Sequence, residues 1–157
     1  MPVSNEQQTI LLGEIQTIVT ENESPNNKLS LVCNLLRDKI PHYDWVGFYF
    51  VSHGNKRELI LGPYAGEPTE HTCIPFGQGI CGQAADSGET IIVDDVNTES
   101  NYLSCNINVK SEIVLPLYHD GELLGQIDID SHTASVFDES DRAFLEMVGC
   151  LVNELLR

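Results

Sequence analysis

Two aspartates alternate with two isoleucines in residues 125–131, GQIDIDS. Because successive side chains of a strand point to opposite faces, Asp128 and Asp130 would share one face and Ile127 and Ile129 the other. Two ionised neighbours on one face repel each other. This face is therefore either the solvated side of a sheet, where acidic residues usually lie, or part of a pocket for a cation or ammonium group.

A third carboxylate joins the two aspartates if the neighbouring strand pairs in a register that buries its apolar side chains. In residues 111–117, SEIVLPL, alternation puts Ile113, Leu115 and Leu117 on one face and Glu112 on the other. The register that buries both apolar sets brings Glu112 to the face of the aspartates. Crowded carboxylates have at least one raised pKa, which suits a proton donor near neutral pH.

A glycine-rich stretch, IPFGQGICGQAADSG, occupies residues 74–88. Its glycines allow close backbone approach, and the AAD run can open a helix whose free N–H groups attract an anion such as a carboxylate. No Gly-Lys-Ser/Thr follows, so the stretch is not a phosphate-binding P-loop, and a tight structural turn is the alternative. Cys81 lies inside it, and a thiol beside helix-terminal N–H groups is expected to have a lowered pKa.

A second cysteine of chemical interest, Cys105, lies in a long polar connection, residues 94–112. Long ordered loops tend to be lids or binding loops. No apolar periodicity surrounds Cys105, which favours a reactive role. Cys33 and Cys150 instead lie in apolar helical patterns and are expected to be packing residues.

A metal site is the rival interpretation of these cysteines. The chain has no Cys-x-x-Cys pair and no His pair at zinc-ligand spacing. His71 and Cys73 are two residues apart in an apparent strand, which is more simply explained as a polar strand edge. We therefore expect no metal and no organic cofactor.

Composition restricts the partners. The 157 residues carry 24 acidic and 8 basic side chains, a formal charge of -16, which argues against nucleic-acid and anionic-membrane partners. No run reaches the ~20 apolar residues that span a bilayer, and the amino terminus lacks a signal-peptide pattern. We expect a cytoplasmic protein with its five cysteines as thiols, so that any disulfide would be transient and catalytic.

The pattern of elements predicts one α+β domain over residues 1–157. Helical spacing covers residues 6–20 and 29–36, and a stripe at 144–155 follows a candidate N-cap, Asp138. A short helix should begin within residues 77–88. Asp-Gly in residues 119–122 indicates a hairpin. Antiparallel strands are expected near 45–51, 57–63, 90–93, 111–117 and 123–130, with the terminal helices on one sheet face.

Five motifs together resemble the GAF-domain family of free methionine-(R)-sulfoxide reductases: WVGFYF (45–50), LILGPYAGEP (59–68), IPFGQGICG (74–82), SEIVLPL and GQIDIDS. The resemblance spans nearly the whole chain and implies a sheet with helices on one face and a loop-covered pocket on the other. It matches Cys105 to the family's nucleophile and Cys81 to the cysteine of the glycine turn. It also matches acidic substrate-binding residues to Glu112, Asp128 and Asp130, and aromatic pocket residues to Trp45 and Tyr49.

The chain departs from the family at two places. Family members usually have a resolving cysteine ten residues before the position of Cys81, where this chain has His71. Cys73 follows two residues later, and an inserted residue after Gly-Pro-Tyr would return it to the same strand face. The family also tends to carry Gly-His before its nucleophile and Asp after it, whereas this chain has NYLS at residues 101–104 and Asn106.

The resemblance implies thiol-dependent reduction of free L-methionine (R)-sulfoxide to methionine. Cys105 would attack sulfur, and a protonated acid such as Glu112 would protonate the departing oxygen. The resulting sulfenic acid would condense with Cys81 or Cys73 to an intramolecular disulfide, which a thioredoxin-type dithiol reduces. Amphipathic terminal helices would pair two copies as a homodimer. The alternatives are a non-catalytic GAF module that binds a small molecule and signals through its helices, and a structural dimerisation unit.

Overall fold

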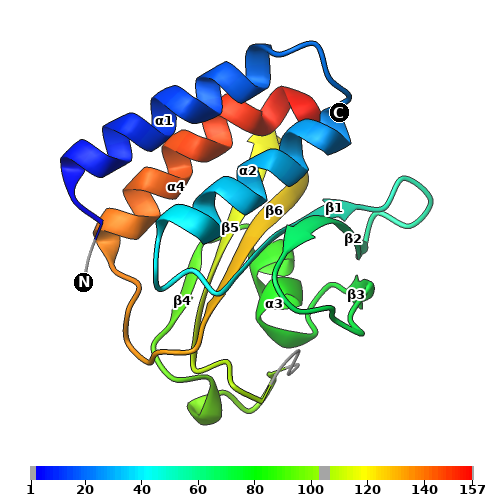
Figure 1. Cartoon of the computed structure of the whole chain (residues 1–157). Coiled ribbons are helices and arrows are strands. Elements are labelled where there is room, and N and C mark those ends of the chain that lie inside the picture. Colours follow the sequence, from blue (N-terminus) through cyan, green and yellow to red (C-terminus); the bar gives the residue numbers. More distant parts are fainter. Residues whose placement is uncertain (1–2, 103–106, 157) are drawn as a thin grey trace.

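A six-stranded antiparallel sheet forms the centre of the protein (Figure 1). The structure, a computed structural model, describes residues 3–102 and 107–156. The strand order is β3-β2-β1-β6-β5-β4. The strands are β1 (Trp45–Val51), β2 (Glu58–Ala65), β3 (Cys73–Pro75), β4 (Ile91–Val93), β5 (Ser111–His119) and β6 (Glu122–Ser131).

Three helices cover one face of this sheet, as the apolar spacing predicts (Figure 1). They are α1 (Asn5–Thr20), α2 (Pro25–Lys39) and α4 (Glu139–Val152), and a 3-10 turn, η2 (Asn153–Leu156), continues α4. Each begins at a side-chain cap: Ser4, Ser24 and Asp138 accept hydrogen bonds from backbone N–H groups of the following turn. These oxygens satisfy N–H groups that a helix start leaves without partners.

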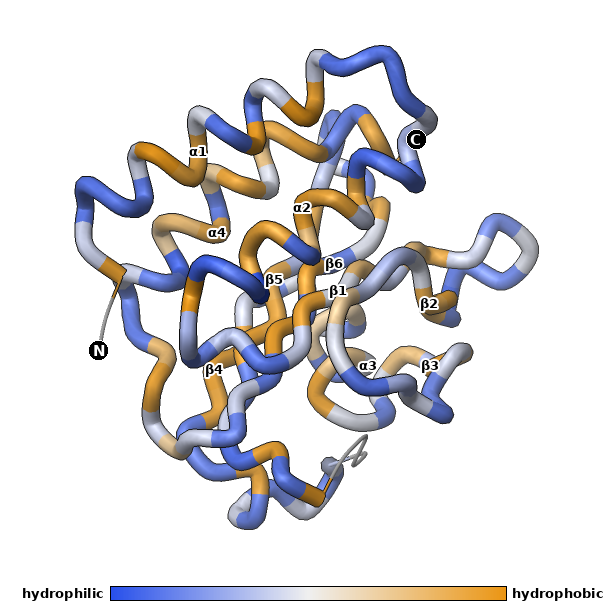
Figure 2. Tube along the Cα trace, in the orientation of Figure 1, coloured by the Kyte–Doolittle hydropathy of each residue, from blue (hydrophilic) through white to orange (hydrophobic). Residues whose placement is uncertain are grey.

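The opposite face carries the short helix α3 (Gly79–Ser87). A 3-10 turn, η1 (Val96–Thr98), lies in the connection between β4 and β5. Two apolar clusters follow from this arrangement, one between the sheet and α1, α2 and α4, and one under α3. Apolar residues accordingly run along β1, β5 and β6 in Figure 2. The predicted α+β pattern is that of the observed fold. β3 lies outside the five predicted strand ranges and begins at Cys73, in the segment that the sequence indicated only as an apparent strand.

The hairpin of β5 and β6 has the predicted register. Ile113 pairs with Ile129 and Glu112 with Asp130 across the two strands. Asp120 and Gly121 both have positive φ, 51° and 79°. Positive φ at both central residues is typical of the two-residue turn that matches strand twist. Among the described helices, none has the length and apolar character that would cross a membrane.

Two glycines give a matched test of this packing. A Cβ on Gly125 of β6 would lie 2.2 Å from the carbonyl oxygen of Tyr49, whereas a Cβ on Gly13 of α1 meets nothing within 4 Å. We expect Gly125→Ala to lower the free energy of unfolding by about 1–3 kcal/mol, because backbone must move. Gly13→Ala should raise it by about 0.5–1 kcal/mol, because alanine restricts the unfolded chain. Urea unfolding measures both, and equal effects would contradict the register.

Candidate functional site

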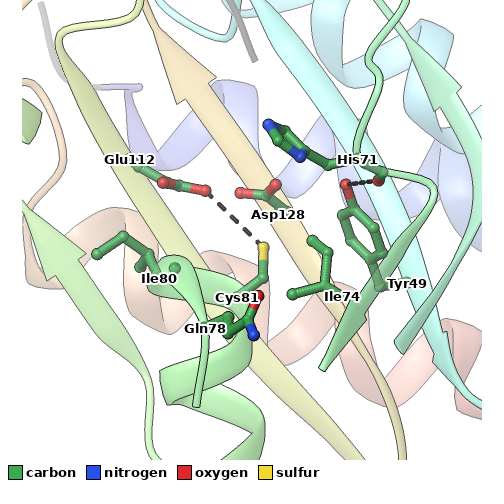
Figure 3. A pocket seen from close by; sticks show the side chains of 9 residues that line it. Tyr49, His71, Ile74, Gln78, Ile80, Cys81, Glu112 and Asp128 are labelled. Carbon is green, nitrogen blue, oxygen red and sulfur yellow. Dashed lines mark hydrogen bonds between the residues drawn. The ribbon is translucent and has the colours of Figure 1, made fainter. Parts of the chain in front are cut away.

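A thiol and two carboxyl groups converge on the sheet face that lacks the terminal helices (Figure 3). Cys81 comes from α3, Glu112 from β5 and Asp128 from β6. One polar atom from each side chain lies within 4.8 Å of the others. The Cys81 thiol donates to Glu112 Oε2 across 3.9 Å. Three elements that are far apart in sequence therefore meet at one point.

These groups line a small cavity of about 10 Å³. Tyr49, His71, Ile74 and Ile80 contribute to its wall. Glu112 is 5% exposed and Asp128 2% exposed, so the acidic face is not a solvated surface. The prediction of a pocket away from the terminal helices is confirmed for these two carboxylates.

Asp130 is also buried, at 2% exposure, but it lines a second cavity of about 50 Å³ together with Trp45. It pairs across the hairpin with Glu112, so this residue pair contributes one side chain to the wall of each cavity. Trp45 stacks on Tyr64, with ring centroids 5.3 Å apart, and its indole N–H donates to the carbonyl of Glu67. The aromatic residues of the predicted site are thus divided, with Tyr49 at the first cavity and Trp45 at the second.

Burial and mutual repulsion keep protons on this acidic cluster. Burial, followed by the charges of Asp128 and Asp130, raises the pKa of Glu112 well above its usual value. Burial and the Asp128 charge raise the pKa of Asp130 in the same way. Burial also raises the pKa of Asp128, but hydrogen bonds from Glu112 and Cys81 oppose that rise. We infer that Asp128 retains the negative charge and that Glu112 is the protonated neighbour, the form that a general acid needs.

The expected lowered pKa of Cys81 is wrong. Burial raises the pKa of this thiol well above its usual value, and the charges of Asp128, Glu112 and Asp130 raise it further. The N–H groups at the start of α3 do not offset a buried position beside three carboxyl groups. Cys81 is therefore a proton-bearing thiol in this structure.

Residues from outside α3 complete its first turn. The N-cap residue Gln78 offers no side-chain hydrogen bond, and Asn101 Oδ1 instead accepts from the Gly79 N–H at 3.2 Å. Asn101 Nδ2 donates to the carbonyl of Gly77 at 2.7 Å. The first N–H of α3, expected to be open to an anion, is thus already bonded. Sequence reasoning missed Asn101 because no local pattern relates it to a helix 22 residues earlier.

Gln126 is a second residue that sequence reasoning missed. It is fully buried, and its Nε2 donates to the carbonyl of Cys81 at 3.1 Å. Strand alternation could have predicted its place, because Gln126 lies two residues before Asp128 and therefore on the same sheet face. Gln126 therefore ties α3 to the strand that carries the aspartates.

The remaining cysteines are distributed differently from expectation. Cys73 is exposed on β3, and the cavity wall is formed by its neighbours His71 and Ile74. A hydrogen bond with Glu58 raises the pKa of Cys73. Cys33 is buried as expected, but the packing role expected for Cys150 is wrong, because that residue is exposed on α4. Cys105, the predicted nucleophile, lies outside the described residues.

His71 and Cys73, the pair that was weighed as a metal site and set aside, are not in a group with metal-ligand spacing in the part of the chain that the structure describes. Within the described residues, the set with metal-ligand spacing is Cys81, Glu112 and Asp128. All three are buried, and their oxygen and sulfur atoms are of the types that bind zinc.

Comparison with known proteins gives a consistent family. A family model described as GAF domain matches residues 23–155. The free methionine-R-sulfoxide reductase of Saccharomyces cerevisiae is 39% identical over 130 residues, which cover 82% of this chain and 72% of the relative.

Two solved structures are similar throughout. The free methionine-R-sulfoxide reductase of Neisseria meningitidis, in complex with its substrate, has a TM-score of 0.89 at 32% identity, covering 99% of this chain and 93% of that one. The type II free methionine-R-sulfoxide reductase of Thermoplasma acidophilum has a TM-score of 0.79 at 34% identity, covering 90% and 94%.

Proposed function

Since this chain belongs to the GAF-domain family of free methionine-R-sulfoxide reductases and is an oxidoreductase, we propose that it reduces free L-methionine (R)-sulfoxide to methionine. The observation that carries the proposal is the buried meeting of Cys81, Glu112 and Asp128 in one cavity. The cavity provides a protonated acid and a thiol, which are two of the groups that sulfoxide reduction requires.

The first step transfers oxygen from the sulfoxide to a cysteine. The Cys105 thiolate attacks the sulfoxide sulfur and forms a sulfur–sulfur bond, while Glu112 protonates the oxygen. The resulting hydroxyl then moves from the methionine sulfur to the Cys105 sulfur, which breaks both the sulfur–sulfur bond and the original sulfur–oxygen bond and releases methionine. In sum, one thiol and one sulfoxide become one sulfenic acid and methionine. The Asp128 charge would then draw a proton back toward Glu112. A cavity of about 10 Å³ has room for roughly one water-sized group, which suits the sulfoxide oxygen.

The second step regenerates the thiols. The Cys81 thiol condenses with the Cys105 sulfenic acid, which forms a disulfide and releases water. A thioredoxin-type dithiol then exchanges with that disulfide and restores both thiols. The raised pKa of Cys81 suits this second role better than the first attack, since the thiol keeps its proton until the sulfenic acid accepts it. We place the reaction in the cytoplasm, where such reductants act.

A coupled assay tests the function. Purified protein, thioredoxin, thioredoxin reductase and NADPH are mixed with the separated R and S epimers of free L-methionine sulfoxide. We expect NADPH loss with the R epimer, one equivalent for each sulfoxide. If calorimetry shows that the sulfoxide binds, but neither thioredoxin nor dithiothreitol supports its reduction, the protein is instead a non-catalytic binding module.

We predict that Cys81 and not Cys73 resolves the sulfenic acid, because Cys81 lies in the cavity and Cys73 is exposed outside it. Cys81→Ser should reduce one equivalent of sulfoxide and then stall with thioredoxin, while a small thiol partly restores cycling. Cys73→Ser should keep cycling. Methionine formed per enzyme, measured by chromatography, distinguishes the two, and a stall in the Cys73 variant would reverse the assignment.

We also predict that two copies pair through the terminal helices. Ile10 of α1, Leu31 of α2 and Met147 of α4 remain 57%, 47% and 47% exposed, so each of the three helices presents a large apolar side chain that a second copy could cover. Static light scattering at micromolar concentration should return about twice the chain mass of 17.4 kDa. The mass of a single chain would contradict the prediction.

A further inference from the structure

The second cavity, lined by Trp45 and Asp130, has no role in the chemistry above. Its volume of about 50 Å³ compares with about 10 Å³ for the cavity at Cys81. It therefore accommodates a group several times larger than a water molecule. Arg37 and His132 also line it.

Asp130 presents an unsatisfied acceptor to this cavity. Its side chain is 2% exposed, and its Oδ1 has no hydrogen-bond partner among the described residues. Buried carboxyl oxygens are nearly always hydrogen-bonded, so an exception calls for a water or a ligand that donates.

Arg37 brings a cation to the same cavity. It lies in the last turn of α2, and its Nε donates to the carbonyl of Asp44 at 2.9 Å, which orients the guanidinium. No described carboxylate forms an ion pair with it. The Asp44 and Glu67 residues also line this cavity, and the Asp44 Oδ2 accepts from the His132 N–H at 2.7 Å. The terminal nitrogens of Arg37 are thus available for a planar anion, which a guanidinium binds through two hydrogen bonds.

A second observation favours Arg37 as the anion-binding group. The first N–H of α3, the other candidate for binding a carboxylate, is bonded to Asn101 Oδ1. A chain with a formal charge of -16 also repels anions at long range, so that binding a carboxylate requires a local cation. Among the residues that line the two cavities, Arg37 is the one whose side chain always carries a positive charge.

We propose that the second cavity binds the amino-acid end of the substrate, with Arg37 contacting the α-carboxylate and Asp130 accepting from the α-ammonium. This inference rests on the proposed function and deepens it. The sulfur end then extends past the Glu112–Asp130 pair into the cavity at Cys81. A methionine sulfoxide within a peptide lacks both end charges, so the cavity selects the free amino acid. Arg37 is a specificity-determining residue in this arrangement.

The test compares two substrates in two variants. Free L-methionine sulfoxide carries the carboxylate, and L-methioninamide sulfoxide does not. We expect Arg37→Gln to raise KM for the free acid about tenfold, as for loss of one charged hydrogen bond, with kcat nearly unchanged. KM for the amide should not change. Arg37→Lys should restore part of the affinity, because it keeps the charge without the planar fork.

Arg142→Gln is the matched control. Arg142 lies on α4, pairs with Glu139 and Glu146, and lines neither cavity. The Arg142→Gln substitution removes the same charge as Arg37→Gln and should leave KM unchanged for both the free acid and the amide. Equal changes for acid and amide in Arg37→Gln, or no change in either, would overturn the inference.

A binding measurement separates this inference from the proposed function. Calorimetry with L-methionine sulfoxide requires no turnover. Weaker binding in Arg37→Gln than in the parent supports the inference even if the parent proves inactive, in which case the reductase proposal alone fails. Equal binding, or no binding by the parent, overturns the role of Arg37.

Discussion

Cys105→Ser is expected to abolish turnover of free methionine sulfoxide. The serine hydroxyl has a far higher pKa than a thiol and cannot supply the thiolate that attacks sulfur. The loss should reach at least about 10³-fold, in line with the loss of a nucleophile in other enzymes. The measurement is NADPH consumption with a thioredoxin system, supported by methionine release in a single turnover.

Two other cysteines are controls for this result. Cys150 is exposed on α4, and Cys33 is buried with its thiol donating to the carbonyl of Pro63. Cys150→Ser should keep the parent rate, and so should Cys33→Ser in protein that remains folded. The buried hydroxyl of the Cys33 variant should lower its melting temperature. If Cys105→Ser reduces the sulfoxide as fast as the parent, the reductase proposal is wrong and the cavities only bind.

The second large effect concerns the proton donor. Glu112→Gln keeps the shape of the side chain but removes the proton that the departing oxygen requires. We expect kcat/KM to fall by about 10²–10⁴-fold, the usual contribution of a general acid. Glu146→Gln, a change of the same type on the surface of α4, is the control and should leave the rate unchanged.

The pH profile identifies the donor. Burial and the charges of Asp128 and Asp130 raise the pKa of Glu112 well above its usual value of 4.5. The acid therefore stays protonated at pH values well above 4.5. Parent activity should therefore fall as the pH rises through this raised pKa. The residual activity of Glu112→Gln should lack that alkaline fall. A fall that persists in the variant would assign the proton to another group.

Glu112→Gln should stabilise the fold although it lowers kcat/KM. A carboxyl whose folded pKa is raised contributes its stability below the unfolded pKa, and that contribution is lost as the pH rises through the folded pKa. Glu112→Gln should therefore raise the free energy of unfolding at pH 8 by about 0.5–2 kcal/mol, with a smaller gain near pH 4. Urea unfolding at both pH values measures this. An inactive variant that is also less stable at pH 8 would contradict the prediction.

Local sequence patterns predicted the part of this site that depends on alternation. Ile127 and Ile129 had to face one way and Asp128 and Asp130 the other, and the same reasoning brought Glu112 beside them. The turn at Asp120-Gly121 then sets the register, because its backbone geometry suits a two-residue connection. The sequence also predicted the N-cap at Asp138, since a cap is a property of neighbouring residues.

Burial could not be predicted in the same way. The position of Cys81 near a helix start suggested a lowered pKa, but the folded chain places its thiol among buried carboxyl groups. Cys150 follows an apolar helical pattern yet remains exposed, because helical spacing places a residue on a face without stating which neighbour covers that face.

The elements, the acidic strand face and the resemblance to a reductase family could be predicted from the amino-acid order, because all three are patterns between near neighbours or ordered motifs. The division of the acidic residues between two cavities, with Asp128 at one and Asp130 at the other, depends on how the folded chain packs. That packing also brings Arg37 from a helix end to Asp130, and Asn101 to the start of α3. These distances arise when helices and strands pack, and packing joins residues whose separation along the chain carries no signal.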